Sequence, residues 1–98
     1  MKINRYEAHI TIDIQHAKEA KIIAYATGWK YSQIHGCPIM GDKTYCYLTG
    51  YNAGDAFKLR QSIDAVISLC IMGQIPVLRA KIEHIIYDTK TGVDTLKS

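Results

Sequence analysis

The stretch INRYEAHITIDIQ, residues 3–15, decides the fold because its polar and apolar side chains alternate without a break. Alternation with a period of two residues is typical of a β-strand that buries one face. The apolar face consists of Tyr6, Ala8, Ile10, Ile12 and Ile14. The opposite, polar face consists of Arg5, Glu7, His9, Thr11, Asp13 and Gln15. We therefore predict a first strand whose polar row points away from the core.

The next three elements follow this strand directly. Residues 16–28 are rich in Ala and Lys, space their apolar side chains as a helix does, and end at Gly28, a common helix stop. Residues 29–35 and 43–49 alternate and carry aromatic side chains, which predicts two strands joined by a turn over residues 36–42. On the second of these strands, Cys46 and Leu48 are expected on the core face, and Tyr45, Tyr47 and Thr49 on the other.

The remaining residues predict one long helix and one more strand. After a turn over residues 50–54, an apolar helical stripe begins with Asp55 in its first turn and stops at Gly73. The stripe consists of Phe57, Ile63, Val66, Ile67, Cys70 and Ile71. A last strand is expected from residue 75 or 76 to about residue 88, followed by a loose polar tail over residues 89–98. On that strand Leu78, Ala80, Ile82, His84 and Ile86 share the core face, and Val77, Arg79, Lys81, Glu83, Ile85 and Tyr87 the other.

The order of these elements, β-α-β-β-α-β, predicts a ferredoxin-like α+β fold. Right-handed crossovers make an antiparallel four-stranded sheet in the order 4-1-3-2 the simplest topology, with both helices on one face. The 98 residues suffice for one core, so residues 1–98 are expected to form a single domain. The other face of the sheet is left to solvent, to a ligand or to another subunit.

Composition excludes several classes of protein. A formal net charge of +3 is mildly basic and lacks the dense stripe of cations found in duplex-binding proteins. The first residues lack an apolar run of signal-peptide length, and no stretch approaches the run of about 20 apolar residues that a membrane span needs, so neither export nor membrane insertion is expected. Cys37, Cys46 and Cys70 lack zinc-ligand spacing and are interpreted as reduced thiols of a cytoplasmic protein. No metal and no cofactor is expected.

In the predicted strand order, one polar cluster gathers on the open face of the sheet. Its members, the candidate ligand-binding residues, are Glu7, His9, Thr11, Tyr45, Tyr47, Arg79, Lys81 and Glu83. Cations and hydroxyls satisfy phosphate oxygens, and tyrosine rings stack on a base. The cluster therefore predicts binding of a phosphorylated, nucleotide-like small molecule. The alternatives are a solvated face whose charges pair across strands, in which Glu7 or His9 meets Lys81 or Arg79, and a contact between subunits.

The residues His9-Ile10-Thr11 resemble one copy of the His-x-Thr motif of the 2H phosphoesterase superfamily. The resemblance implies binding or cleavage of 2′,3′-cyclic or 2′-5′ phosphodiesters by two such motifs on two lobes, with the histidines as general acid and base. Here His84 is the second candidate, but it lacks the hydroxyl and falls on the core face. The chain is one lobe long, so a full site needs a homodimer. Only His9 and Thr11 are carried over, as phosphate ligands, and no catalytic residue is assigned.

The small, basic, Tyr-rich chain is also similar in size and style to compact virus-encoded proteins that sequester nucleotide signals of bacterial immunity. This resemblance favours binding over turnover. Two other functions stay open. One is a 2H-like phosphodiesterase, and the other is a module that binds single-stranded RNA through Tyr45 and Tyr47, although the third strand lacks the Gly- and Phe-rich signature of RNA-recognition-motif domains. A homo-oligomer is expected both for the nucleotide-binding protein and for the 2H-like phosphodiesterase.

Overall fold

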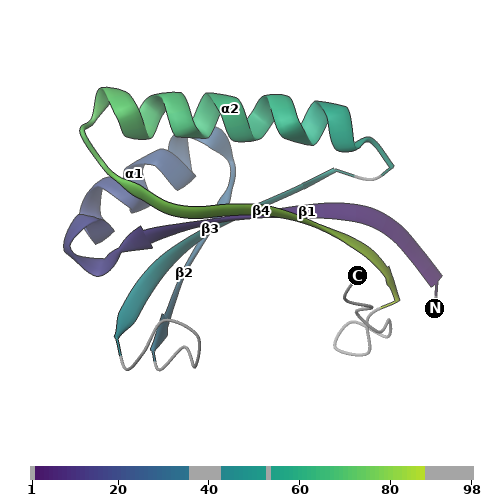
Figure 1. Cartoon of the computed structure of the whole chain (residues 1–98), viewed down its shortest axis with the longest axis horizontal. Coiled ribbons are helices and arrows are strands. Elements are labelled where there is room, and N and C mark those ends of the chain that lie inside the picture. The colour runs from purple at the N-terminus through teal and green to yellow at the C-terminus, as the bar shows by residue number, and fades with distance from the viewer. Residues whose placement is uncertain (1, 36–42, 53, 88–98) are drawn as a thin grey trace.

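The sheet and helices follow the predicted order. The computed structural model describes residues 2–35, 43–52 and 54–87. Its elements are β1 (Lys2–Asp13), a short 3-10 helix η1 (Ile14–His16), α1 (Ala17–Thr27), β2 (Lys30–His35), β3 (Thr44–Asn52), α2 (Ala56–Met72) and β4 (Val77–Tyr87). All neighbouring strands are antiparallel and the sheet order is β2-β3-β1-β4 (Figure 1). The predicted ferredoxin-like α+β fold is therefore confirmed.

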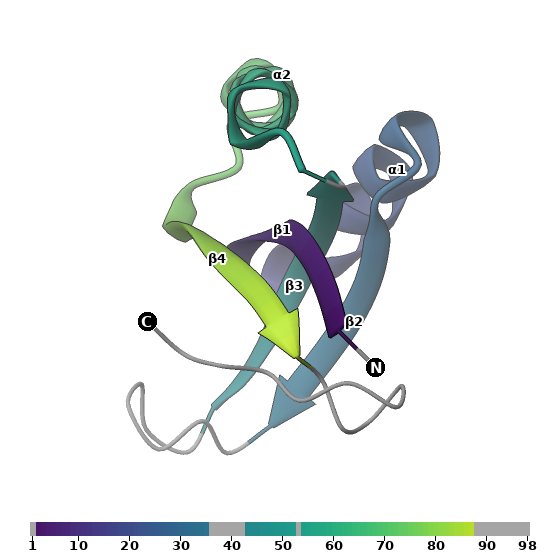
Figure 2. The same ribbon diagram turned by 90° about the vertical axis from the view of Figure 1, so that its right-hand side faces the viewer.

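Both helices cover the same face of the sheet, as expected (Figures 1 and 2). α1 packs over the side of β2 and β3, and α2 packs over β1 and β3. The core between the layers consists of Ala8, Ile10, Ile12, Ala20, Ile23, Ala24, Cys46, Leu48, Leu59, Ile63, Val66, Cys70 and Ile75. No helix in the described segments has the length and apolar character needed to cross a membrane.

β1 ends two residues earlier than its alternation predicts. The side chain of Asp13 accepts a hydrogen bond from the backbone N–H of Gln15 at 3.0 Å, which turns the chain into η1. Ile14 therefore leaves the sheet and is 37% exposed. The prediction that Ile14 belongs to the buried row is wrong, because a local cap competes with the strand.

α2 buries the middle of the predicted stripe, with Ile67 packed against the core, but not the two residues at its ends. Asp55 is not in its first turn but caps it, accepting a hydrogen bond from the backbone N–H of Lys58 at 3.0 Å. Phe57 and Ile71, predicted to be buried, are 72% and 70% exposed. The buried residues are Leu59, Ile63, Val66 and Cys70. At about 100° per residue, Phe57 lies roughly 120° around the helix axis from Ile63, outside the face that meets the sheet.

β3 continues through the predicted turn. Gly50, Tyr51 and Asn52 pair with β1 instead of turning. Gly50 stays in the strand because the Trp29 indole lies against its backbone, where a Cβ atom would come within 2.4 Å of Trp29 Cε2. The glycine thus makes room for a neighbouring ring, a use of glycine that a turn signal does not distinguish.

The start of the last strand and the state of two cysteines agree with the predictions. β4 begins at Val77, just after the predicted start. Cys46 and Cys70 are buried and free. The predicted turn 36–42, with Cys37, and the predicted tail 89–98 lie outside the described residues.

The core-facing row of β4 is less covered than predicted. Ala80 and Ile82 lie opposite Ile10 and Ala8 of β1, on the side of the sheet that carries the helices. However, Leu78 is 44% and Ile82 39% exposed, because the helices pack over β1, β2 and β3. None of the described apolar residues of this row is buried. The buried residue of β4 is Ile85, which lies opposite Arg5 on the face predicted to be open and is 3% exposed. Val77, also predicted on that face, packs against the core, because a shift in register between Thr11 and Ile12 places it opposite Ile12.

Candidate functional site

The register of the strands brings the predicted site residues together on the open face. His9 lies opposite Thr49 of β3 and Lys81 of β4. Two residues along β1, Glu7 lies opposite Tyr51 and Glu83. In the other direction, three further pairings place Thr11 opposite Tyr47 and Arg79, and Asp13 opposite Tyr45. All eight predicted residues thus share one face in three neighbouring cross-sheet rows and the start of a fourth.

His9 is held from both ring nitrogens. Its Nδ1 lies 3.2 Å from Thr49 Oγ1. Its Nε2 lies 3.5 Å from Glu7 Oε1 and 3.6 Å from Glu83 Oε1. Burial lowers the pKa of His9 below its ordinary value of 6.5, outweighing the opposite effect of Glu83 and Glu7, while Lys81 lowers it further. The imidazole is therefore neutral at pH 7.

His9 and Thr11 share a face, as the His-x-Thr spacing requires, but they are not hydrogen-bonded to each other. The threonine that bonds His9 is Thr49, from a strand 40 residues away in sequence. Thr11 is only 3% exposed and lies beneath the side chains of its neighbours. Alternation placed Thr49 on this face, but only the register of β1 against β3 puts it opposite His9.

Two of the cations on this face are already neutralised. Arg5 donates from Nε and Nη2 to Glu7 Oε2 at 3.1 and 2.7 Å. Lys81 Nζ lies 2.9 Å from Glu83 Oε1. The pairing predicted across strands for Glu7 with Lys81 or Arg79 is therefore replaced by pairing along each strand. His9 does pair across strands, but with Glu83.

Arg79 and Lys30 differ from these paired cations. Both are exposed, and neither makes an ion pair with any residue that the structure describes. Arg79 stands opposite Thr11, whereas Lys30 begins β2 opposite Thr49. Sequence reasoning missed Lys30 because its face depends on how β2 pairs with β3.

The tyrosines of β3 are unequally accessible. Tyr45 is 7% exposed and Tyr47 is half-buried. The Tyr45 ring therefore offers little surface for stacking. Tyr51 is 64% exposed, and the Arg5 guanidinium lies 5.4 Å from the centre of its ring. Tyr51 escaped sequence reasoning because residues 50–54 read as a turn.

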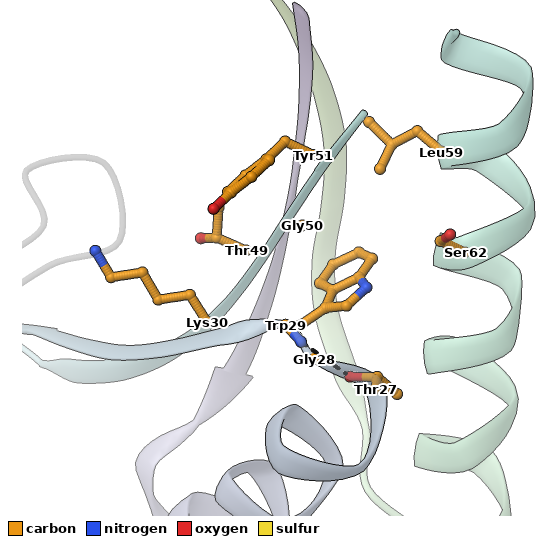
Figure 3. A pocket seen from close by; sticks show the side chains of 9 residues that line it. All are labelled: Thr27, Gly28, Trp29, Lys30, Thr49, Gly50, Tyr51, Leu59 and Ser62. Carbon is orange, nitrogen blue, oxygen red and sulfur yellow. Dashed lines mark hydrogen bonds between the residues drawn. The ribbon is translucent and has the colours of Figure 1, made fainter. Parts of the chain in front are cut away.

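A cavity of about 310 Å³ lies beside the end of the β2–β3 pairing, at Lys30 and Thr49 (Figure 3). Its lining comes from the end of α1, the start of β2, the end of β3 and one face of α2: Thr27, Gly28, Trp29, Lys30, Thr49, Gly50, Tyr51, Leu59 and Ser62. Figure 3 shows the Trp29 indole between the strand and α2. Thr49 belongs both to this lining and to the hydrogen bond with His9, so the cavity and the polar rows share this residue.

His84 lies apart from the site, as predicted. Its ring stacks on Tyr6, with centroids 4.5 Å apart and an interplanar angle of 16°, on the side of the sheet that carries the helices. In the parts of the chain that the structure describes, no group of three His, Cys, Asp or Glu side chains is placed to hold a metal ion.

The open face therefore offers one neutral imidazole, two carboxylates, several hydroxyls and an exposed guanidinium. Such a set can accept hydrogen bonds at the carboxylates and donate them at the hydroxyls and at Arg79. Comparisons with models of protein families, with curated proteins and with solved structures find no match to this chain.

Proposed function

We propose that this protein binds a phosphorylated, nucleotide-like small molecule on the open face of its sheet. The observation that carries the proposal is the exposed guanidinium of Arg79, which makes no ion pair with the described residues and stands in the row of Thr11 and Tyr47. A guanidinium presents several N–H donors in a fork that matches phosphate oxygens. The Tyr47 hydroxyl supplies a further donor in the same row.

The charges on the face favour one orientation of the ligand. Glu7 and Glu83 form a carboxylate row on the far side of His9 from Arg79, and they repel a phosphate while accepting hydrogen bonds from sugar hydroxyls or base amino groups. Glu7 and Thr11 are four residues apart along β1, or about 13 Å at 3.3 Å per residue. A mononucleotide placed with its phosphate at Arg79 therefore directs its base toward the exposed Tyr51 ring.

Turnover by a 2H-like mechanism is the second candidate, favoured by the neutral imidazole of His9 and its bond to Thr49. General acid–base cleavage of a phosphodiester needs two proton-transferring groups at one phosphate. The structure describes three histidines on the strands. His35 of β2 and His84 of β4 each lie on the helix-facing side of the sheet, and only His9 lies on the open face. Binding is therefore preferred over turnover.

Titration calorimetry tests the proposal with a panel of adenosine 5′-monophosphate, a 2′,3′-cyclic nucleotide and a 2′-5′-linked dinucleotide. We expect at least one to bind, and Arg79→Gln to weaken its binding about tenfold or more, since a charge-assisted hydrogen bond is lost. Lys18→Gln on α1 removes the same charge from the helix layer and should leave the affinity unchanged. Lack of binding throughout the panel, or equal losses in both variants, contradicts the proposal.

The same samples distinguish binding from turnover. After prolonged incubation, chromatography should recover each nucleotide unchanged. A product that forms with the wild-type chain and not with His9→Gln would instead establish the phosphodiesterase.

A further inference from the structure

The two edges of the sheet differ in length and in chemistry. At one edge β2 has six residues, and most of its side chains are polar. At the other edge β4 has 11 residues and pairs with β1 but with no other strand that the structure describes. A long edge strand presents backbone donors and acceptors that another strand can pair with.

β4 also carries apolar surface that the helices leave uncovered. Leu78 and Ile82 are 44% and 39% exposed on the helix-facing side. Beside them runs a groove of about 360 Å³ between β4 and α2. Its lining consists of Arg60, Ile63, Asp64 and Ile67 from α2 and Ala80, Lys81 and Ile82 from β4. Among the residues that the structure describes, none covers the outer edge of β4 beside this groove, which points to a partner that adds a strand.

We infer that β4 forms an antiparallel pair with β4 of a second copy of this chain. The twofold axis that relates the two copies lies between their Ile82 residues. The two four-stranded sheets then join into one continuous sheet with all four helices on the same side. Because paired residues of antiparallel strands share a face, a twofold axis perpendicular to the sheet must lie midway between the two strands at the level of one residue, which it pairs with its own copy.

The charges of β4 select this register. With the axis at Ile82, Lys81 of each copy lies opposite Glu83 of the other. Each Lys81 already lies 2.9 Å from its own Glu83, so the four charges alternate in sign around the seam. Opposite charges placed directly across two strands stabilise the pairing, and like charges weaken it.

The neighbouring registers lack this complementarity. An axis at Lys81 places the two lysines opposite each other, and an axis at Glu83 places the two glutamates opposite each other, so like charges meet in both cases. An axis at Ala80 brings Arg79 opposite Lys81, a pair of cations. Among the four positions 80–83, only Ile82 therefore gives complementary charges on the open face.

The same register brings two apolar side chains together on the helix-facing side. The two Ile82 side chains meet across the axis, and Ala80 of each copy lies opposite His84 of the other. The exposed part of Ile82 is thereby removed from water, beside the groove of each α2. The seam thus satisfies both faces of β4 at once.

The dimer keeps the two ligand surfaces separate. Each His9 lies one strand inside β4, so the two imidazoles are three strand spacings apart across the sheet and therefore at least about 14 Å from each other. Two groups at that separation do not reach the same phosphate. This dimer therefore provides two independent binding faces and no paired-histidine centre.

Sedimentation velocity and disulfide trapping test the inference. The wild-type chain should sediment as a dimer of the 11.0 kDa chain. Under mild oxidation I82C should form a cross-linked dimer, because residues paired on the axis have Cβ atoms about 4.5–5.5 Å apart, near disulfide range. A80C is the matched control on the same face. Its two copies are offset by four residues, about 13 Å, and should not cross-link.

A charge exchange tests the register independently. K81E should weaken dimerisation about tenfold or more, because each new carboxylate meets two others. The double variant K81E/E83K restores alternating charges and should recover most of the lost affinity. A wild-type chain that remains monomeric over its soluble range overturns the inference. Cross-linking of A80C in place of I82C, or no recovery in the double variant, also overturns it.

Discussion

His9 and Thr49 face each other across β1 and β3, with Nδ1 3.2 Å from Oγ1. If the threonine hydroxyl donates to Nδ1, the proton lies on Nε2, which is 3.5 Å from Glu7 Oε1 and 3.6 Å from Glu83 Oε1 and is thus near two negative charges. This arrangement gives every polar group around the ring a partner of the opposite kind. The neutral imidazole is thus fixed in orientation by one hydroxyl and by two carboxylates.

Thr49→Val should destabilise the fold by about 1 kcal/mol, because the valine keeps the shape of threonine but leaves His9 Nδ1 without its partner. Thr49→Ser, which retains the hydroxyl, is the control and should lose less. Urea unfolding followed by circular dichroism measures both. Equal losses in the two variants would indicate that the methyl group, and not the hydrogen bond, stabilises this row.

The stability of the protein should fall as the pH drops below about 6.5. Burial lowers the pKa of folded His9, so the unfolded chain takes up a proton more readily than the folded one. The stability linked to neutral His9 is then complete above the unfolded pKa and is lost as the pH falls toward the folded pKa.

Free energies of unfolding measured from about pH 8 to about pH 5 check this dependence. His9→Gln should show a shallower loss across that interval than the wild-type chain. His35→Gln, which removes an exposed histidine from β2, controls for the loss of an imidazole as such. Parallel curves for the wild-type chain and His9→Gln would contradict the prediction.

The face of the site was predictable from sequence, but its contacts were not. Alternation along residues 3–15 assigns His9 and Thr11 to one side, because side-chain direction in a strand depends only on parity. The partner of His9 depends on the register of β3 against β1. That register is set by the packing of side chains on the opposite, helix-facing side of the sheet. Lys30 and Thr49 therefore joined the site only once the strands were paired.

Gly50→Ala should destabilise the fold by about 1–3 kcal/mol, the usual cost of overpacking. The added Cβ atom would approach Trp29 Cε2 to 2.4 Å, so the indole must shift from its place beside the core. Thermal or urea unfolding measures the loss. In a Trp29→Leu background the same substitution should cost much less, and an unchanged cost there would mean that the ring is not the obstacle.

Trp29 and Gly50 also illustrate where sequence patterns fail for the fold. The residues Gly50-Tyr51-Asn52-Ala53-Gly54 are a strong turn signal, yet the strand continues through Asn52, and the indole of Trp29, which precedes β2, occupies the space beside Gly50. In the same way, Phe57 and Ile71 fit a helical stripe, but the sheet beneath α2 meets only the side that carries Ile63. Helix and strand type were set locally, whereas the buried face was set by tertiary packing.

Glu83→Gln should tighten the binding of a phosphorylated ligand several-fold. Glu83 holds Lys81 in an ion pair and places a negative charge beside His9, so its removal frees a cation and lowers repulsion of the phosphate. Calorimetry with the nucleotide that binds the wild-type chain measures the change. Glu19→Gln on α1 alters the net charge equally and should have little effect. Weaker binding by Glu83→Gln would mean that this carboxylate accepts a hydrogen bond from the ligand and that the phosphate lies beyond the reach of Lys81.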